Sequence, residues 1–202
     1  MKLILIRHGQ TANNISKRYT GVTDVPLTSE AEREAEELAP FRADRVFSSP
    51  LMRAVRTAEI LFPENEIEIS EGLHEMDFGK FEGKTAEEMA DDPDFKAWIK
   101  GGCIGKCPGG ESAEGMRDRV AGTLEKIVTP LFGTSCRTAA VVCHGAAIMG
   151  MMSAFADPDR YIWEWLVGNY GGYEIDPEYT NSRIIFKKYR KFEKMGGLDY
   201  LR

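Results

Sequence analysis

The sequence contains no long apolar run, and no segment approaches the roughly 20 consecutive apolar residues that a membrane-spanning helix requires. Met1 and Lys2 lead directly into a short apolar segment without the cleavage site of a signal peptide. We therefore expect a cytoplasmic protein that has no membrane partner. The sequence also lacks internal repeats and low-complexity segments, which argues against a solenoid and against a long disordered arm.

Cysteine is scarce, and its spacing does not suit a metal site. Cys103, Cys107, Cys136 and Cys143 form no C-x-x-C pair, so free thiols are expected. The glycine-rich segment 101–107 superficially resembles a nucleotide-binding P-loop. Its glycine spacing is one residue short, and Cys107 stands where such a loop needs Ser or Thr, so we reject that interpretation.

Excess positive charge is also missing, because the formal net charge is -6. This balance disfavours general binding to nucleic acid, although an acidic protein can still focus a local positive pocket on a phosphate. The composition, 43% hydrophobic and 29% charged, is that of an ordinary globular protein. We expect residues 1–202 to form one domain with a full core.

The continuous apolar segment 2–6 predicts a strand that is buried on both faces, and segments 44–48 and 138–142 are predicted to be two more strands of the same buried kind. Helical patterns lie between them: Ser29 and Glu32 predict a capping box at the start of one helix, and 51–61 predicts another. This alternation predicts an α/β fold, a three-layer sandwich with a mainly parallel central sheet and helices on both faces.

The rest of the chain extends this pattern. The further expected elements are a short strand at 66–70, a long helix at 111–132 that stops near Pro130, a buried helix at 145–155, and antiparallel edge strands at 172–175 and 182–186. Residues 83–112 are polar and helical, then loop-rich. We interpret them as a small cap inserted over the strand ends, where it would set specificity.

Polar clusters follow the predicted strands. Arg7, His8 and Gly9 come directly after the first strand, and His144 follows the strand at 138–142. The carboxyl ends of parallel strands are where α/β proteins place their chemistry. An arginine beside a histidine suits an anionic phosphoryl group, which the histidine could attack, and the glycine would let the backbone approach the ligand.

Taken together, these clusters resemble the histidine phosphatase superfamily, also called phosphoglycerate mutase-like proteins, over most of the chain. The motifs that carry the resemblance are Arg7-His8-Gly9, Asn14, Tyr19-Thr20-Gly21, Leu27-Thr28, Ser48-Ser49-Pro50-Leu51-x-Arg53-Ala54-x-x-Thr57-Ala58, Glu75, Phe78-Gly79-x-x-Glu82-Gly83 and His144-Gly145. Each motif alone is weak evidence, but their order and separation together are specific.

The resemblance implies a role for each main residue. His8 would be the nucleophile that forms a phosphohistidine, while Arg7, Arg53 and a protonated His144 would hold the nonbridging oxygens. Glu75 would be the general acid that later serves as the base. A phosphate dianion in a desolvated pocket independently needs such donors, because each charge-assisted hydrogen bond contributes roughly 1.5–3 kcal/mol.

Further implied contacts are weaker. Asn14, Thr20 and Gly21 match positions that supply neutral phosphate donors, and the second nitrogen of His8 is expected to bind a backbone carbonyl in the same turn. The resemblance implies no cofactor and no metal. We interpret His74 as a loop residue or a substrate contact, because a pocket with two arginines would repel a divalent cation.

Several conspicuous side chains are expected to have ordinary structural roles. Arg56 should pair on the surface. Tyr161, Trp163 and Trp165 are expected to pack in the core or at the rim, with stacking on an aromatic leaving group as the alternative. The basic residues Lys187, Lys188, Arg190 and Lys191 form a tail that is expected to be a solvated face rather than a dimer arm, and a homodimer stays open.

The motifs favour phosphomonoester hydrolysis. Mutases of the family continue Arg-His-Tyr-Gly after the acid, whereas Met76-Asp77-Phe78-Gly79 stands here, which looks like small bacterial phosphatases such as the α-ribazole-5'-phosphate phosphatases. The expected substrate is therefore a small phosphorylated metabolite, α-ribazole 5'-phosphate or a sugar phosphate. The alternatives are a cofactor-dependent phosphoglycerate mutase and a noncatalytic phosphate-binding protein.

Overall fold

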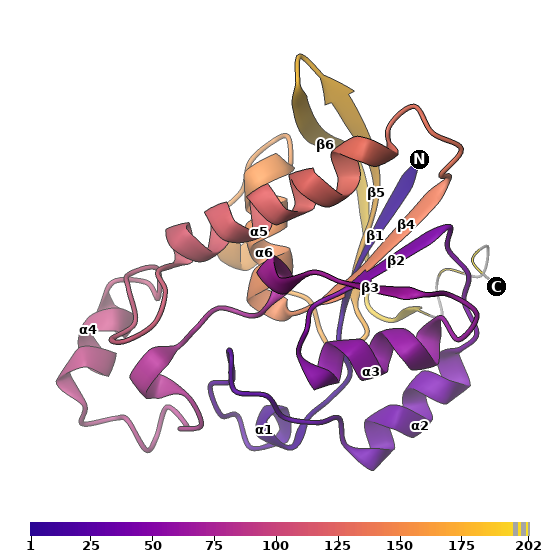
Figure 1. Ribbon diagram of the computed structural model, residues 1–202. Helices are drawn as coiled ribbons and strands as arrows, with labels where there is room; N and C mark the ends of the chain where they lie inside the picture. The colour runs from indigo at the N-terminus through magenta and orange to yellow at the C-terminus, as the bar shows by residue number, and fades with distance from the viewer. Residues whose placement is uncertain (196–197, 199–200, 202) are drawn as a thin grey trace.

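A central six-stranded sheet organises the computed structural model, which describes residues 1–195, 198 and 201 (Figure 1). Its strands are β1 (Lys2–Arg7), β2 (Arg45–Ser48), β3 (Ile67–Ile69), β4 (Thr138–Cys143), β5 (Gly172–Thr180) and β6 (Arg183–Phe192). They lie in the order β3-β2-β4-β1-β5-β6. The pairs among β1 to β4 are parallel, and β5 and β6 are antiparallel.

Helices connect the strands. The α-helices are α1 (Ala12–Ile15), α2 (Ser29–Leu38), α3 (Met52–Leu61), α4 (Pro93–Lys100), α5 (Ala113–Val128) and α6 (Gly145–Phe155). Short 3₁₀ helices are η1 (Glu71–Leu73), η2 (Gly79–Phe81), η3 (Thr129–Leu131) and η4 (Ile162–Trp165). Among the described residues, no helix combines the length and the apolar character that crossing a membrane would require.

The sheet has a hydrophobic core on each face, and the fold is the predicted α/β sandwich. Leu3 and Leu5 of β1 belong to the core under α5 and α6, while Ile4 and Ile6 belong to the core under α2 and α3. Figure 1 shows these two helix pairs on opposite sides of the strands. Both sides of β1 are therefore covered, which explains why its sequence is a continuous apolar run rather than an alternating one.

Several predicted boundaries were wrong. Thr28 rather than Ser29 is the N-cap of α2, accepting the Ala31 N–H through its hydroxyl. Glu32 makes no capping box, because its side chain pairs with Arg56 instead. The long helix ends at Val128 and passes into η3, which contains Pro130, a residue that cannot continue the α-helical bond ladder.

The edge strands are longer than predicted. β6 extends from Arg183 to Phe192, so the four basic residues expected in a tail lie within the sheet. Arg190 pairs with Glu174 on the neighbouring strand, and Lys187 pairs with Glu178. Basic residues lie on this edge strand beside apolar ones, and cross-strand ion pairs support such an edge.

The segment predicted as a cap contains α4 and long loops beside α1, to one side of the sheet (Figure 1). Hydrogen bonds tie its end to the loop before η2: Lys80 N donates to Pro108 O (2.9 Å), and Glu111 N donates to Asp77 O (2.8 Å). Gly79 allows this close approach with a φ of +52°, and an added Cβ would lie 2.2 Å from Pro108 O.

Gly172→Ala should destabilise the sheet, because a Cβ at this position would lie 1.7 Å from Leu5 O in the neighbouring strand. We expect the free energy of unfolding to fall by about 1 to 3 kcal/mol, as for other overpacked sites. The control is Gly122→Ala within α5, where no atom lies within 4 Å of the added Cβ. It should raise stability by about 0.5 to 1 kcal/mol in the same urea titration. Equal effects of the two variants would contradict the packing argument.

Candidate active site

The ends of two neighbouring strands bring two histidines together. β1 and β4 pair in a register that places Arg7 opposite Cys143, so His8 and His144 leave the sheet at the same level. His8 N donates to Cys143 O (3.0 Å), and the two imidazole ring centroids lie 5.1 Å apart. The parallel register therefore aligns two histidines that are 136 positions apart in the sequence.

His8 is buried, with 3% of its surface exposed, and its hydrogen bond defines its tautomer. Its Nδ1 lies 2.6 Å from Gly9 O, in the same turn. Because a carbonyl oxygen only accepts, this contact assigns the ring proton to Nδ1 and leaves the lone pair on Nε2. Burial and the nearby guanidinium groups of Arg53 and Arg7 lower the pKa of His8 well below its usual value, so the ring is neutral near pH 7.

Arg7 lies at the end of β1 and reaches into the site. Its Nη1 donates to Val167 O (2.7 Å), whereas its Nε has no hydrogen-bond partner among the described residues. Burial lowers its pKa, and the Glu75 carboxylate partly offsets this effect. Because buried polar groups are normally paired, the Nε–H fits a ligand oxygen as its missing acceptor.

Arg53 approaches from α3 and is almost fully buried. Its Nη1 donates to Thr23 O (3.0 Å) and its Nη2 to Gly21 O (2.7 Å). These carbonyls orient the planar guanidinium. Burial lowers the pKa of Arg53, although nearby carboxylates, Glu75 first among them, oppose this change.

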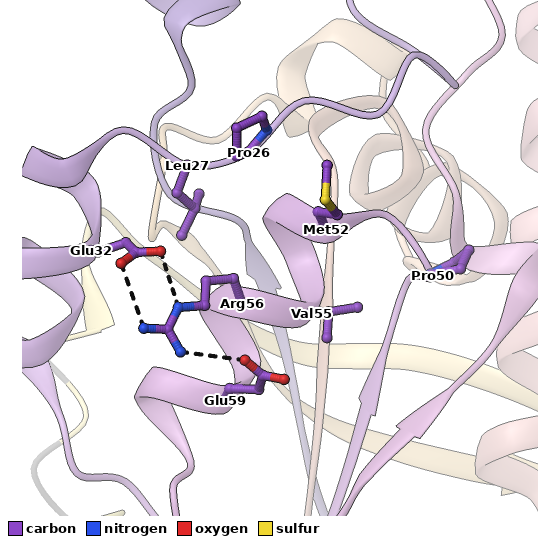
Figure 2. Close-up of a pocket in the computed structure, with 8 residues that line it drawn as sticks. All are labelled: Pro26, Leu27, Glu32, Pro50, Met52, Val55, Arg56 and Glu59. Atoms are coloured by element: carbon purple, nitrogen blue, oxygen red, sulfur yellow. Dashed lines mark hydrogen bonds and ion pairs between the residues drawn. The ribbon is translucent and has the colours of Figure 1, made fainter.

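Arg56, one turn further along α3, points away from the site. It donates to Glu32 (3.0 Å) and pairs with Glu59 (3.4 Å), as Figure 2 shows. These residues border a surface hollow of about 420 Å³ that also contains Met52 and Val55 and is separate from both histidines. The structure thus distinguishes the two arginines as the sequence motif predicted.

Glu75 sits against the start of α6. Its Oε1 accepts from Met76 N (2.8 Å) and Ala147 N (3.2 Å), and its Oε2 accepts from Ala146 N (3.1 Å). The helix N-terminus therefore holds the carboxyl group through N–H groups that have no partner within the helix. Glu75 lines the same cavity as Arg7, and 8% of it is exposed, so a bound molecule can reach it.

His144 is fully buried, and its Nε2 lies 2.6 Å from Ser49 Oγ. Its Nδ1 has no hydrogen-bond partner in the described part of the chain. Burial, followed by the proximity of His8 and the site arginines, lowers the pKa of His144 well below its usual value. The ring is therefore neutral near pH 7 in the ligand-free site, and a protonated His144 beside a bound phosphate stays a prediction.

The predicted neutral donors differ in their placement. Asn14 and Thr20 line the cavity, and the Asn14 Oδ1 accepts from Thr11 N (3.1 Å), which directs its amide NH₂ elsewhere. Gly21 does not line it: its N–H donates to Glu82 Oε1 (3.0 Å), and its carbonyl holds Arg53. Gly21 therefore supports the site instead of offering an amide to a ligand.

Gly9 also has a role other than the predicted one. A Cβ at this position would lie 2.1 Å from Tyr170 Oη, so the missing side chain makes room for the buried Tyr170 ring. The Gly9 N–H donates to Thr57 Oγ1 (3.0 Å), and that hydroxyl donates to Arg53 O (2.7 Å). Gly9 thus joins the His8 turn to α3.

The cavity beside these residues measures about 220 Å³. Its polar lining residues are Arg7, Asn14, Arg18, Thr20 and Glu75, and most of the remaining lining is apolar. The apolar lining residues are Tyr19, Met76, Phe78, Trp98, Met149, Trp163 and Leu166. Of the three aromatic residues near position 163 that the sequence singles out, Trp165 is buried in the core, Tyr161 borders a different hollow, and Trp163 lines this cavity.

His74 lies beside the cavity, with its Nδ1 2.8 Å from Glu75 O. It faces backbone rather than the other two histidines. In the described residues, no group of three His, Cys, Asp or Glu side chains is arranged to hold a metal ion.

Sequence reasoning missed two residues that organise the site. Arg119 of α5 donates to the carbonyls of Gly72 (2.9 Å), His74 (2.9 Å) and Glu75 (3.3 Å) and forms a bidentate pair with Glu111. This pair holds the loop that carries Glu75. The Glu111-Ser112 motif was visible in the sequence, but its partner lies on a helix face that looks like an ordinary charged surface.

Asn169 is the second missed residue. Its Nδ2 donates to His8 O (2.9 Å) and lies 3.5 Å from Asn14 Oδ1. It thereby connects the histidine turn to α1. No local pattern in the sequence indicates this role, because the contact joins residues that lie at opposite ends of the chain.

Comparisons with known proteins agree with this geometry. The profile of the histidine phosphatase superfamily (branch 1) matches residues 3–188. The uncharacterized phosphatase PhoE of Bacillus subtilis (strain 168) is 33% identical over 90% of this chain and 82% of its own length. A 2,3-bisphosphoglycerate-dependent phosphoglycerate mutase of Cytophaga hutchinsonii is 30% identical over 74% of this chain and 75% of its own.

A solved structure shares the fold. The α-ribazole phosphatase from Shigella flexneri superposes with a TM-score of 0.81, covering 96% of this chain and 97% of that one, at 23% identity. At this level of identity the likeness establishes the architecture alone. The relatives thus include both phosphatases and a mutase.

Arg119→Met should loosen the loop that carries Glu75. It would remove the partner of Glu111. Burial alone would raise the pKa of Glu111, but the hydrogen bonds from Arg119 lower this pKa below its usual value. We expect the free energy of unfolding to fall by about 2 to 3 kcal/mol in a urea titration, because a part-buried carboxylate and several carbonyls lose their donor. The control is Arg117→Met on the same helix, whose arginine pairs with exposed Asp118, and it should change stability by less than about 0.5 kcal/mol. Similar losses of stability in both variants would contradict the proposed role of Arg119 in holding the loop that carries Glu75.

Stability should also depend on pH through the two buried histidines. Both have a lowered pKa in the folded protein, so below about pH 6.5 the unfolded chain binds protons that the folded chain does not. Between pH 7.5 and 5.5 the free energy of unfolding should therefore fall, by up to about 1.4 kcal/mol per pH unit for each histidine. Chemical denaturation at both pH values measures this, and His8→Gln should show a shallower dependence. An unchanged wild-type stability at pH 5.5 would show that the rings protonate normally.

Proposed function

Because the chain belongs to the histidine phosphatase superfamily (branch 1), we propose that it is a phosphomonoester hydrolase that forms a phosphohistidine on His8. The observation that carries this proposal is the state of the His8 ring. Its Nδ1–H is donated to Gly9 O, and the Nε2 lone pair lies in a site that two guanidinium groups border. A neutral imidazole with a free lone pair is a nucleophile at pH 7 without a general base.

In the first step, the Nε2 lone pair of His8 attacks phosphorus and the bond from phosphorus to the leaving oxygen breaks. Glu75 delivers a proton to that oxygen, so the alcohol leaves neutral and the phosphoryl group stays on the imidazole. Arg7 and Arg53 face the nonbridging oxygens. The total negative charge of the phosphoryl group changes little in the transition state, but more of it lies on the nonbridging oxygens. The two positive charges stabilise it there.

In the second step, a water molecule attacks phosphorus and returns its proton to the Glu75 carboxylate. The bond between phosphorus and Nε2 breaks, and inorganic phosphate and the original His8 are restored. One carboxyl group serves both steps because it lies on the side of the cavity where the alcohol departs and the water enters.

The charge balance supports a mechanism that needs no metal and no cofactor. The site holds two guanidinium groups and one carboxyl group, that of Glu75, which enters the first step as the protonated acid; this arrangement suits a dianion and would repel a divalent cation. His144 contributes as a neutral ring in the free site. Its unpartnered Nδ1 and the unpartnered Nε of Arg7 are two further groups that phosphate binding can satisfy.

The substrate we propose is a small phosphorylated metabolite, and α-ribazole 5'-phosphate and sugar phosphates are the first candidates. The name of the Shigella flexneri neighbour supports the former, at the level of a shared fold. A phosphoglycerate mutase is the second candidate, because a relative of that name is 30% identical. A noncatalytic phosphate-binding protein is the third, and the intact set of His8, Arg7, Arg53 and Glu75 argues against it.

His8→Ala should abolish turnover of p-nitrophenyl phosphate, because it removes the ring nitrogen that is proposed to accept the phosphoryl group. We expect kcat to fall at least about 10⁴-fold. The wild-type enzyme, quenched during turnover of a ³²P-labelled substrate, should carry acid-labile and base-stable label that the variant lacks. Retained turnover in His8→Ala would move the nucleophile to another residue.

Two further conditions separate the alternatives. Wild-type activity should be unchanged in EDTA, and its loss on chelation would contradict the metal-free mechanism. With 3-phosphoglycerate and 2,3-bisphosphoglycerate, a hydrolase should release inorganic phosphate, whereas rapid formation of 2-phosphoglycerate would identify a mutase. Neither product with any phosphomonoester would indicate a noncatalytic protein.

A further inference from the structure

The apolar lining of the active-site cavity indicates what the phosphate is attached to. Beside its polar residues, the cavity is lined by the large apolar side chains of Trp163, Leu166, Tyr19, Phe78 and Trp98. Resting on the proposed function, we propose that the leaving group is a flat, uncharged, aromatic alcohol, and that Trp163 is the side chain against which it packs.

Trp163 is exposed and yet held in place. Its side chain lies on η4, and 40% of the residue is exposed. The indole Nε1–H donates to Gly102 O (3.2 Å), which joins the ring to the segment predicted as a cap. Leu166, three residues on, is 51% exposed. When an apolar ligand covers large apolar side chains that are fixed and exposed at the mouth of a polar site, the removal of this surface from water favours binding.

The remaining aromatic residues are preassembled. The Tyr19 ring centroid lies 5.3 Å from that of Phe78 and 5.8 Å from that of Trp98, in edge-to-face arrangements. Trp98 donates its Nε1–H to Gly105 O (3.0 Å), so its orientation is also fixed. A surface that is already ordered costs little conformational entropy when a ligand binds, which favours a flat aromatic ligand over a flexible one.

The charges of the cavity argue against a carboxylate or a second phosphate on the leaving group. Arg18 lines the cavity, but it forms a bidentate pair with Glu88 (2.8 and 3.0 Å) and donates to Gly83 O (2.6 Å). Its charge is therefore already compensated. Lys17 does not line this cavity: it is exposed at an adjoining hollow of about 490 Å³, so a carboxylate would have to leave the cavity to reach it.

The decisive experiment compares alkyl phosphates whose alcohols have similar basicity, so that leaving-group chemistry does not differ. The substrates are 2-phenylethyl phosphate, ethyl phosphate and 3-phosphoglycerate, and phosphate release gives kcat/KM for each. We expect the phenylethyl ester to exceed ethyl phosphate at least about tenfold in kcat/KM, mainly through a lower KM. The 3-phosphoglycerate value should not exceed that of ethyl phosphate.

Trp163→Ala should lower kcat/KM for the phenylethyl ester about tenfold and should change kcat/KM for ethyl phosphate less than about twofold. Trp163→Phe should keep most of the preference, because it retains an aromatic face. Tyr161→Ala is the matched control: it removes an aromatic side chain that is 58% exposed and lies two residues away, but that borders another hollow. It should leave the ratio between the two esters unchanged.

The possible outcomes separate this proposal from the proposed function. Hydrolysis of all three substrates without a preference, or a preference for 3-phosphoglycerate, would overturn the aromatic leaving group and leave the phosphatase in place. An equal loss of both alkyl esters in Trp163→Ala would assign Trp163 a structural role and overturn its proposed contact. Failure to hydrolyse any of the three would overturn the proposed function itself, and this proposal with it.

Discussion

The site depends on two guanidinium groups that are held inside the protein. Placing a cation out of water is costly unless its donors are paired, and here the backbone supplies the partners. Arg53 donates to the carbonyls of Gly21 and Thr23. The loop that provides them is fixed in turn by Glu82, whose carboxylate accepts the N–H groups of Gly21, Val22, Thr23 and Phe78. An acidic side chain thus orients a cation without contacting it, which leaves the positive charge for a ligand.

The same positive field controls the chemistry of the histidines. Burial, reinforced by Arg53 and Arg7, keeps the His8 ring neutral, and a neutral ring is the form that the proposed attack on phosphorus requires. Glu75 is placed differently. It lies against the N–H groups at the start of α6, so the carboxyl group keeps a defined position although two cations lie near it. The groups that hold charge and the groups that move protons are therefore anchored by separate parts of the fold.

Periodicity predicted the parts of this arrangement that follow from strands. The interiors of β1 and β4, residues 3–6 and 139–143, carry no charge, and Arg7 and His144 directly after them mark the edge where these parallel strands end. Parallel pairing of β1 and β4 was enough to bring these polar residues together. The Arg119 clamp was not predictable, because it joins a helix face to carbonyls 44 to 47 residues away, and backbone acceptors leave no trace in residue identity. The edge strands were predicted too short because their basic residues look like a solvated tail until the ion pairs across the sheet are known.

The two sets of site residues follow from different constraints. The residues proposed to hold the phosphate lie at the ends of β1 and β4 and at the start of α3, so the pairing of the central sheet fixes where they meet. The aromatic lining is assembled from separate loops and short helices that carry Tyr19, Phe78, Trp98 and Trp163, and none of these belongs to a strand of the sheet. Loops tolerate substitution better than the elements they connect. The architecture can therefore keep the proposed chemistry at His8 constant while these four positions change which alcohol is accepted, which is why the motifs point to the superfamily and the proposal for the leaving group had to come from the assembled structure.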